Sequence, residues 1–357
     1  MLDLTPRQQT MLVFVIREYV ESAKPVSSKM LAEKYGLDYS PATIRAELAR
    51  LEEMGYLTHP HTSAGRMPTD RGYRYFVQRL MGEVDLPITE QRMIAHQFHQ
   101  SRLDLTQWMQ LAASVLARAN MATRPDGTRS TALVSLVTPP HARRARLKHI
   151  QLISTQGRLV LLVVVLHDGT VKQEMLTLAE PLSQDTLSEA SARLNATVVG
   201  LTAEELTKRL GSVDETLHAE VLGVVSDVMR RADAWLATEV YRDGLTEVLR
   251  LPEYEGREMA EALLGILEEQ SLLEEVLTQA PGPAIGGVQV VIGGENNWAE
   301  LRDFSLVLAR YGVSDYATGT LGVLGPMRMP YGRAVSTVRY VSRLLSDLVS
   351  DMAQGYG

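Results

Sequence analysis

Apolar residues at helical spacing predict three short helices within the first 55 residues of the chain. The first begins at Thr5-Pro6, where a capping hydroxyl precedes a proline at the first helical position. Its apolar stripe consists of Leu12, Val15, Ile16, Tyr19 and Val20. A second helix of about two turns follows Ser27 and stops at Gly36. A third begins at Ser40-Pro41, ends near Gly55 and turns inward the side chains of Ile44, Leu48 and Leu51.

The outer face of the third predicted helix is small, polar and cationic. It carries Ala42, Thr43, Arg45, Ala46, Ala49 and Arg50. Small residues let a helix enter the major groove of DNA, while Thr and Arg side chains reach base edges and phosphates. A short turn followed by such a helix is typical of a helix-turn-helix, although the same periodicity also occurs in ordinary helical bundles.

A hairpin is predicted directly after the third helix. Tyr56-Leu57-Thr58 has the composition of a short strand, and a turn-rich loop at 59–66 precedes Met67-Pro68. Three helices followed by a hairpin predict a winged helix, with Arg66 at the tip of the wing, entering the minor groove or contacting phosphate. Taken alone, Arg66 would be a solvated loop residue, and it is the order of the elements that favours the wing.

The remainder of the chain alternates between helical and β-type patterns. Residues 88–120 and 181–280 are helical in pattern, and a C-terminal helix ends the chain. The β-rich runs span 132–137, 147–154, 159–166, 171–178, 288–292, 304–308 and 320–324. Strands interrupted by about a hundred mostly helical residues predict one α+β domain that contains an inserted domain.

Composition excludes several classes of protein. A chain of 357 residues is long enough for two or three domains, and 45% hydrophobic against 22% charged residues is typical of globular proteins. Because the chain has no cysteine, it cannot form disulfides, Cys-based zinc sites, iron–sulfur clusters or a Cys nucleophile. The longest apolar run, at 159–166, is too short to cross a bilayer, so we expect a cytoplasmic protein without membrane contact.

The distribution of charge is more informative than its sum. The net charge of −7 does not favour binding to nucleic acid. Residues 1–80, however, hold 11 Lys and Arg against 9 Asp and Glu, whereas the remainder holds 25 against 34. We therefore expect a weakly basic binding module on an acidic body.

No catalytic or metal-binding constellation emerges from the sequence. His96 and His99 lack the spacing and the glutamate of a zinc protease. Glycine pairs at 286–287 and 293–294 lack the Lys-Ser/Thr of a phosphate-binding loop, which favours ordinary turns. We predict neither an enzyme nor a cofactor.

Two groups of segments resemble the family of the heat-inducible transcription repressor HrcA. The N-terminal group comprises PVSSK at 25–29, SPATIRAE at 40–47, LEEMGYL at 51–57 and PHTSAGRMPTDRGYR at 60–74. The C-terminal group comprises VIGGE at 291–295 and GTLGVLGPMRMPY at 319–331. The family usually has Asn where this chain has Ala46, and Gly where it has Ser27. Without that Asn, one base preference is lost or shifts to Thr43 and Arg45.

This resemblance implies a fold and a function. It implies a bacterial repressor that binds the inverted-repeat CIRCE operator as a homodimer, with its active form supported by the GroEL chaperonin. It also implies a winged helix at 1–82, a GAF-like domain at 88–178 and 284–357, and an inserted dimerisation domain at 179–283. Contacts with double-stranded DNA are then expected from Ser40, Pro41, Ala42, Thr43, Arg45, Ala46, Arg50, His61, Thr62, Ser63 and Arg66. The alternative is a ligand-gated winged-helix regulator with a small-molecule pocket in the GAF-like domain.

Overall fold

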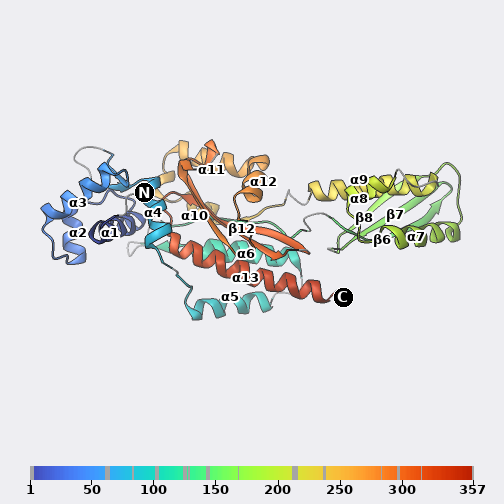
Figure 1. The fold of residues 1–357 in the computed structure, drawn as a ribbon, viewed down its shortest axis with the longest axis horizontal. Helices are drawn as coiled ribbons and strands as arrows, with labels where there is room; N and C mark the ends of the chain where they lie inside the picture. Colours follow the sequence, from blue (N-terminus) through green and yellow to red (C-terminus); the bar gives the residue numbers. More distant parts are fainter. Residues whose placement is uncertain are drawn as a thin grey trace. The chain divides into compact units, whose positions relative to one another are not determined.

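The computed structural model mixes helices and strands throughout its length, as the sequence predicted (Figure 1). It describes residues 4–60, 65–82, 84–100, 104–123, 127, 129–141, 145–167, 169–210, 216–235, 239–282, 284–295, 298–314 and 316–355. The chain divides into two compact units. The first unit comprises residues 1–138, 240–311 and 320–348, and the second comprises 139–239, 312–319 and 349–357.

The first unit begins with an N-terminal segment, residues 4–60 and 65–82, that has the predicted three helices followed by a short ribbon. Its helices and strands are α1 (Pro6–Ser22), α2 (Ser28–Tyr35), α3 (Pro41–Glu53), β1 (Leu57–Thr58), β2 (Met67–Pro68), α4 (Asp70–Tyr75) and the π-helix η1 (Phe76–Leu80). Thr5, Ser27 and Ser40 cap the three helices through their hydroxyls, as expected for Ser and Thr at that position. The strands β1 and β2 pair antiparallel.

A five-stranded sheet, here called the central sheet, lies mostly in the same unit, with the facing ends of β11 and β12 in the second. Its strand order is β10-β11-β12-β5-β9. These strands are β10 (Val288–Ile292), β11 (Phe304–Val313), β12 (Ala317–Pro326), β5 (Val134–Val137) and β9 (Tyr241–Asp243). The strand β9 lies within the segment that we predicted to be helical, because three residues are too few to show a β period. It is held in place by antiparallel pairing with β5.

Helices cover both faces of the central sheet (Figure 1). They are α5 (Ile88–Gln100), α6 (Leu105–Ala119), α10 (Leu245–Val248), α11 (Arg257–Glu268), α12 (Gln270–Gln279) and α13 (Tyr331–Gly355), with the short helices η2 (Pro252–Tyr254), η3 (Gly293–Glu295) and η4 (Ala299–Leu301) and the ribbon β3 (Ala122–Thr123) and β4 (Arg129–Thr131) beside them. All four residues of β5 are buried, which requires cover on both faces. One face packs into an apolar cluster with α11 and α12. Toward α6, the Tyr311 hydroxyl contacts Met109.

A buried arginine connects the N-terminal segment to the rest of the first unit. Arg328 follows β12 and is only 3% exposed. Its guanidinium forms an ion pair with Glu253 and donates at 2.6 Å to the carbonyl oxygens of Val20, in α1, and Ser130, in β4. A buried guanidinium is tolerated only when its donors have acceptors, so these contacts fix how α1 lies on the central sheet.

Two further polar contacts join the same parts. Arg74 in α4 donates at 3.0 Å to the carbonyl oxygen of Val290 in β10. The backbone N–H of Gly294 donates at 3.0 Å to Asp70, also in α4.

The junction at Arg328 also affects Tyr19 of α1. Burial, and then the nearby carboxylate of Glu253, raise the pKa of the Tyr19 phenol.

The second unit contains a three-stranded antiparallel sheet with helices on one face. The strands are β6 (Leu147–Gln156), β7 (Leu159–Leu166) and β8 (Val171–Thr177), and the helices are α7 (Gln184–Val198), α8 (Ala203–Leu210) and α9 (Thr216–Trp235). Alternate residues of β7, beginning with Val160, are buried against these helices. This division differs from the predicted one, because helical periodicity cannot tell which strands a helix packs against. The strands at 147–177 pack with the helices α7, α8 and α9 in the second unit. The helices α10, α11 and α12 lie in the first unit.

Side chains of α7 occupy the outer edge of β6. Asn195 exchanges two hydrogen bonds of 2.8 Å with the backbone of Ile150. Ser191 accepts from Leu152 N–H at 3.0 Å, and Gln184 accepts from Ser154 N–H at 2.8 Å. These groups take the place of a fourth strand, so the edge is covered.

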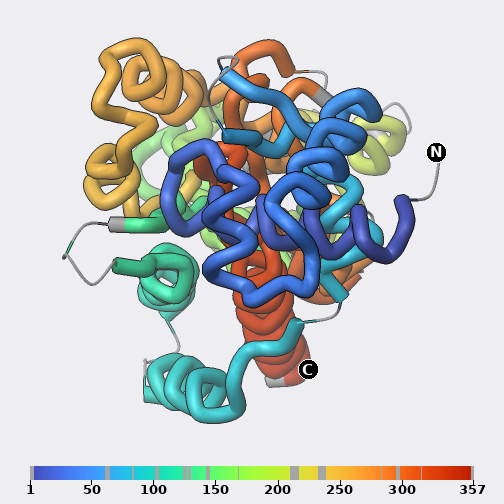
Figure 2. Tube along the Cα trace, turned by 90° about the vertical axis from the view of Figure 1, so that its left-hand side faces the viewer, coloured from blue at the N-terminus to red at the C-terminus, as the bar shows by residue number. Residues whose placement is uncertain are grey.

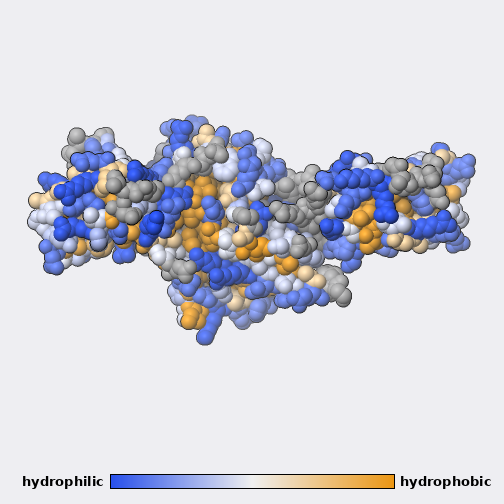
Figure 3. Space-filling model, in the orientation of Figure 1, coloured by the Kyte–Doolittle hydropathy of each residue, from blue (hydrophilic) through white to orange (hydrophobic). Residues whose placement is uncertain are grey.

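The opposite face of this sheet carries hydrophobic residues that no described element covers. We call it the outer face of β6–β8. Three rows cross it: His149, Val165 and Val171; Gln151, Val163 and Gln173; Ile153, Leu161 and Met175. Val171 and Met175 are 53% and 52% exposed. Figure 3 shows hydrophobic residues gathered over the strands of this unit. Among the described residues, no helix has the length and apolar character needed to cross a membrane.

The buried arginine leads to a prediction about stability. Replacing Arg328 with Met leaves the Glu253 carboxylate and two carbonyl groups without their donor, so we expect a loss of about 3 kcal/mol in unfolding free energy. The control is Arg250→Gln, which removes an exposed ion pair with Glu247 and is expected to cost ~0.5 kcal/mol or less. Urea denaturation followed by circular dichroism measures both, and equal losses would contradict the assigned role of Arg328.

Candidate nucleic-acid interface

Helix α3 presents a polar outer face because its apolar residues point into the N-terminal segment. Ile44, Leu48 and Leu51 are between 0% and 3% exposed. The face opposite to them is solvent-accessible over Pro41, Ala42, Arg45, Ala46 and Arg50. Figure 2 shows the helices of this segment grouped together. The predicted orientation of α3 is therefore confirmed.

The first turn of α3 is shaped by two hydroxyl groups. The Ser40 hydroxyl accepts from Thr43 N–H at 3.1 Å and lies 3.0 Å from the Thr43 hydroxyl. Ser40 is exposed and Thr43 is partly exposed. Both hydroxyls keep lone pairs for a further partner, since an oxygen of this type accepts two hydrogen bonds.

The cations on α3 differ in their partners. Arg50 lies 3.2 Å from the carboxylate of Glu47, which is itself buried beside Gln8 of α1. Arg45 is exposed and forms no ion pair within the part of the chain that the structure describes. An unpaired guanidinium between the small residues Ala42 and Ala46 can approach an anion without first losing a partner. Arg45 is therefore the most available cation on this face.

Two residues beside α3 escaped the sequence analysis. Arg7, at the start of α1, lies 3.7 Å from the carboxylate of Glu47 and stacks over the ring of Tyr39 at 4.6 Å from its centroid. Tyr39 immediately precedes the capping Ser40 and is 36% exposed. An exposed aromatic residue directly before a helix cap was the available signal, but the approach of Arg7 depends on tertiary packing.

Arg66 ends the loop of the ribbon, directly before β2, and is bound to neighbouring segments instead of standing free at a tip as we expected. Its backbone exchanges two hydrogen bonds with Val26, of 2.8 and 2.9 Å, and its guanidinium lies 2.7 Å from the carboxylate of Glu52 on α3. The side chain is 21% exposed. Glu52 also contacts His59. The predicted contact residues His61, Thr62 and Ser63 lie outside the described residues.

Gly65 permits the close approach between the ribbon and the segment that precedes α2. A Cβ atom at Gly65 would lie 2.5 Å from the carbonyl carbon and oxygen of Val26. Real Cβ atoms do not approach backbone atoms so closely, which excludes larger residues at this position without a shift of the backbone. This glycine therefore brings Arg66 within reach of α3.

A second polar cluster holds α2 against α1. Glu18, 5% exposed, accepts from Lys34 Nζ at 2.9 Å and from the Tyr35 hydroxyl at 2.7 Å. The rings of Phe14 and Tyr35 stack with centroids 3.9 Å apart. Burial, and then the hydrogen bond to Glu18, raise the pKa of Tyr35 to about 12. The hydrogen bond to Glu18 is also the main reason why the pKa of Lys34 is raised.

Comparison with known sequences assigns the chain to a family. The family model described as "HrcA protein C terminal domain" matches residues 128–335, more than half of the chain. The chain belongs to the HrcA family. The resemblance found in the sequence motifs is thereby confirmed.

Two curated relatives and one solved structure illustrate the match. The heat-inducible transcription repressor HrcA of Roseiflexus castenholzii is 45% identical over 98% of this chain and 96% of its own. That of Herpetosiphon aurantiacus is 43% identical over 98% and 97%. The crystal structure of a hypothetical protein is similar with a TM-score of 0.54 and 23% identity, over 98% of both chains. At that identity the likeness concerns the fold alone.

The contacts of Glu18 predict a loss of stability at alkaline pH. The folded-state pKa values of Tyr35 and Lys34 both lie above their ordinary values, so the unfolded chain loses these protons first as the pH rises. The contribution to stability is complete below about pH 10 and disappears as the pH rises through about 12. Urea denaturation across this range is expected to show a shallower decline for Tyr35→Phe. An identical decline in both proteins would remove Tyr35 from this explanation.

Proposed function

We propose that this HrcA-family chain represses transcription by binding operator DNA through a winged helix formed by residues 1–82. The family consists of heat-inducible transcription repressors, which are not a class of enzymes. Within the winged helix, α3 is the recognition helix and the β1–β2 ribbon is the wing. The observation that supports this most directly is Arg45, exposed and unpaired among the described residues of a helix whose neighbouring positions are small.

The proposed DNA contacts are those expected from the sequence, with different roles. Arg45 reads a base edge or a phosphate, and the hydroxyls of Ser40 and Thr43 accept or donate near the start of the helix. Arg50 and Arg66 are bound to acidic residues of α3 and contribute mainly by reducing its negative charge. The other contacts in this proposal are Pro41, Ala42, Ala46, His61, Thr62 and Ser63.

The proposed operator is the inverted-repeat CIRCE element, bound by a homodimer. An inverted repeat requires two recognition helices related by two-fold symmetry. The chain carries a net charge of −7, so electrostatic attraction to DNA is weak for a single subunit. Joining two modules makes the second half-site contact intramolecular and raises affinity by ~10²–10⁴ without new contacts.

We place the dimer contact on the outer face of β6–β8. Its three rows contain no Asp, Glu, Lys or Arg, and hydrophobic residues occupy most of their positions. A contiguous exposed apolar surface on a folded domain marks an interaction site. The helices α7 to α9 already cover the other face, so a second copy of this sheet is the partner that buries the outer one. The inserted dimerisation domain then corresponds to the second unit, residues 139–239.

The remaining domain is proposed to be GAF-like. Its central sheet, with helices on both faces, is compatible with that fold. Family membership also supports regulation by the GroEL chaperonin, which we propose to assist this repressor toward its DNA-binding form. The alternative of a ligand-gated regulator of other genes is not favoured, because the relatives are heat-inducible repressors.

Substitution of Arg45 tests the recognition helix. Arg45→Gln is expected to weaken operator binding by about 1–3 kcal/mol and to relax preference at one base pair. Arg45→Lys is the matched control, because it keeps the charge but loses the bidentate geometry. We expect it to retain non-specific binding while losing the base preference. Fluorescence anisotropy at one salt concentration measures both variants, and an unchanged operator Kd for folded Arg45→Gln would remove Arg45 from the interface.

Substitutions on the outer face test the dimer. Ile153→Lys combined with Met175→Lys places two charges in one row of the sheet, so we expect monomers and operator binding about 100-fold weaker. Ala192→Lys, on the exposed face of α7, is the matched control and should leave the dimer intact. Sedimentation analysis and operator titration are carried out on the same samples. A dimer that survives the double substitution would place the interface elsewhere.

Refolding in the presence of GroEL tests the chaperonin proposal. We expect added GroEL to raise the fraction of freshly refolded protein that binds operator, because the chaperonin assists the active form. Operator-binding capacity is titrated at increasing GroEL, with an equal mass of serum albumin as control. A fraction that does not change over the whole titration would contradict the proposal.

A further inference from the structure

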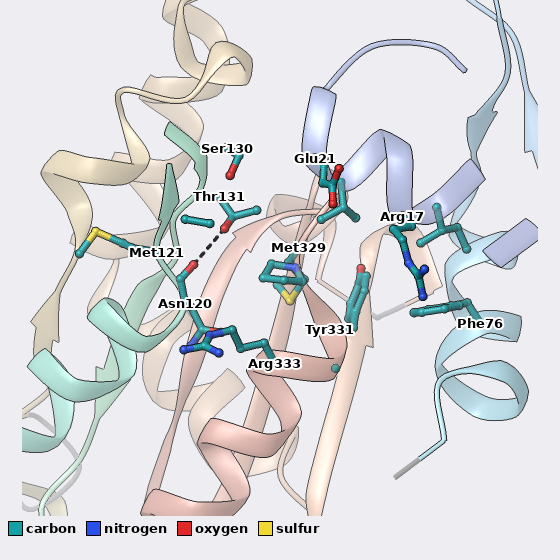
Figure 4. A pocket seen from close by; sticks show the side chains of 15 residues that line it. Arg17, Glu21, Phe76, Asn120, Met121, Ser130, Thr131, Met329, Tyr331 and Arg333 are labelled. Atoms are coloured by element: carbon teal, nitrogen blue, oxygen red, sulfur yellow. Dashed lines mark hydrogen bonds between the residues drawn. The ribbon is translucent and has the colours of Figure 1, made fainter. Parts of the chain in front are cut away.

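A cavity of about 440 Å³ lies between α1 and η1 on one side and the ribbon β3–β4 and the start of α13 on the other (Figure 4). All of its walls belong to the first unit. This volume falls within the ~300–1,000 Å³ typical of small-molecule sites. The family comparison assigns no ligand to it, and it is separate from the proposed recognition helix α3.

The walls of the cavity are mainly apolar. Phe76 and Tyr331 supply aromatic rings, and Met121 and Met329 supply thioethers. Such walls accept a flat aromatic group, because rings and methionine sulfur make favourable contacts with one. The apolar centre therefore favours an aromatic body in the ligand.

Asn120 provides an unpaired acceptor in the wall. Asn120 is 1% exposed, and its side-chain amide nitrogen donates to the carbonyl oxygen of Leu116 at 2.8 Å. Among the described residues, its Oδ1 atom has no hydrogen-bond partner. A buried acceptor without a donor is costly, so a ligand that brings an N–H or O–H group to this side gains affinity.

Arg17 provides a positive charge on the other side. Figure 4 shows Asn120 and Arg17 on opposite sides of the cavity, with Met329 and Tyr331 between them. Arg17 is exposed and forms no ion pair within the described residues. The other charged wall residues already have partners: Arg333 pairs with Glu90, and Glu21 with Lys34. Arg17 is thus free to bind a carboxylate.

We propose that this cavity binds a small aromatic carboxylic acid that also carries a hydrogen-bond donor. The carboxylate pairs with Arg17, the ring lies against Met329 and Tyr331, and the donor reaches Asn120. The walls come from α1 and η1 of the N-terminal segment and from β3, β4 and α13 beside the central sheet. A ligand that contacts both sides therefore stabilises the arrangement in which the N-terminal segment packs against these elements. The effect of the ligand on operator affinity rests on the proposed function, whereas the binding of the ligand to the cavity does not.

Three matched probes separate the two polar ends of the site. Indole-3-acetate has both a carboxylate and a ring N–H, 1-naphthaleneacetate has the carboxylate without the N–H, and tryptophol has the N–H with a neutral hydroxyl in place of the carboxylate. By calorimetry on the full chain, we expect indole-3-acetate to bind at least tenfold more tightly than either of the others. Equal affinities for all three, or no binding of indole-3-acetate, would overturn the proposal.

Variants locate the binding. Arg17→Gln should weaken indole-3-acetate about tenfold and leave tryptophol unchanged, whereas Arg92→Gln, an exposed arginine on α5, should alter neither. Ala122→Trp, at an exposed wall position of β3, should block all probes. Circular dichroism confirms folding in each case. If indole-3-acetate binds Arg17→Gln and Ala122→Trp as tightly as the parent chain, the cavity is not its site.

Operator titration then tests the link to DNA binding. With saturating indole-3-acetate we expect the operator Kd to change at least threefold, because the probe favours one docked arrangement. An unchanged Kd alongside intact probe binding would refute the regulatory role. Failure to bind operator without any probe would instead concern the proposed function alone, since calorimetry requires no DNA.

Discussion

The burial of the Arg328 guanidinium is the constraint on which the first unit depends. Its donors are satisfied only if Val20 of α1, Ser130 of β4 and Glu253 meet at one point. A strand end, an N-terminal helix and a ribbon from three distant parts of the sequence are thereby brought together. Because an unpaired buried charge is far more costly than a lost apolar contact, this junction has little freedom to loosen gradually.

Most cations near α3 are neutralised by acidic residues of the same segment. Glu47 is paired with Arg50 and Arg7, and Glu52 with Arg66. The segment therefore resembles a general polyanion-binding surface much less than its count of basic residues indicates. On the described part of α3, Arg45 is left without an ion pair, so its guanidinium is the charge of this helix that is most available to an anion.

Local signals predicted the elements well, and long-range partners remained hidden. Ser40-Pro41 and the spacing of Ile44, Leu48 and Leu51 located α3 and its exposed face. Arg66 was misplaced because its partner Glu52 is known only once the ribbon folds back onto α3. The position of the cavity beside α1 was not foreseen either, since its walls come from segments more than two hundred residues apart.

The polar side chains of α7 limit how this protein associates with others. Gln184, Ser191 and Asn195 occupy backbone hydrogen-bond positions along β6 that a foreign strand would otherwise use. An open strand edge permits further strands to be added without limit, and along β6 these three side chains occupy the positions where that would begin. In a heated cell, where unfolding proteins expose many such strands, the backbone of Ile150, Leu152 and Ser154 is therefore not open to pairing with them.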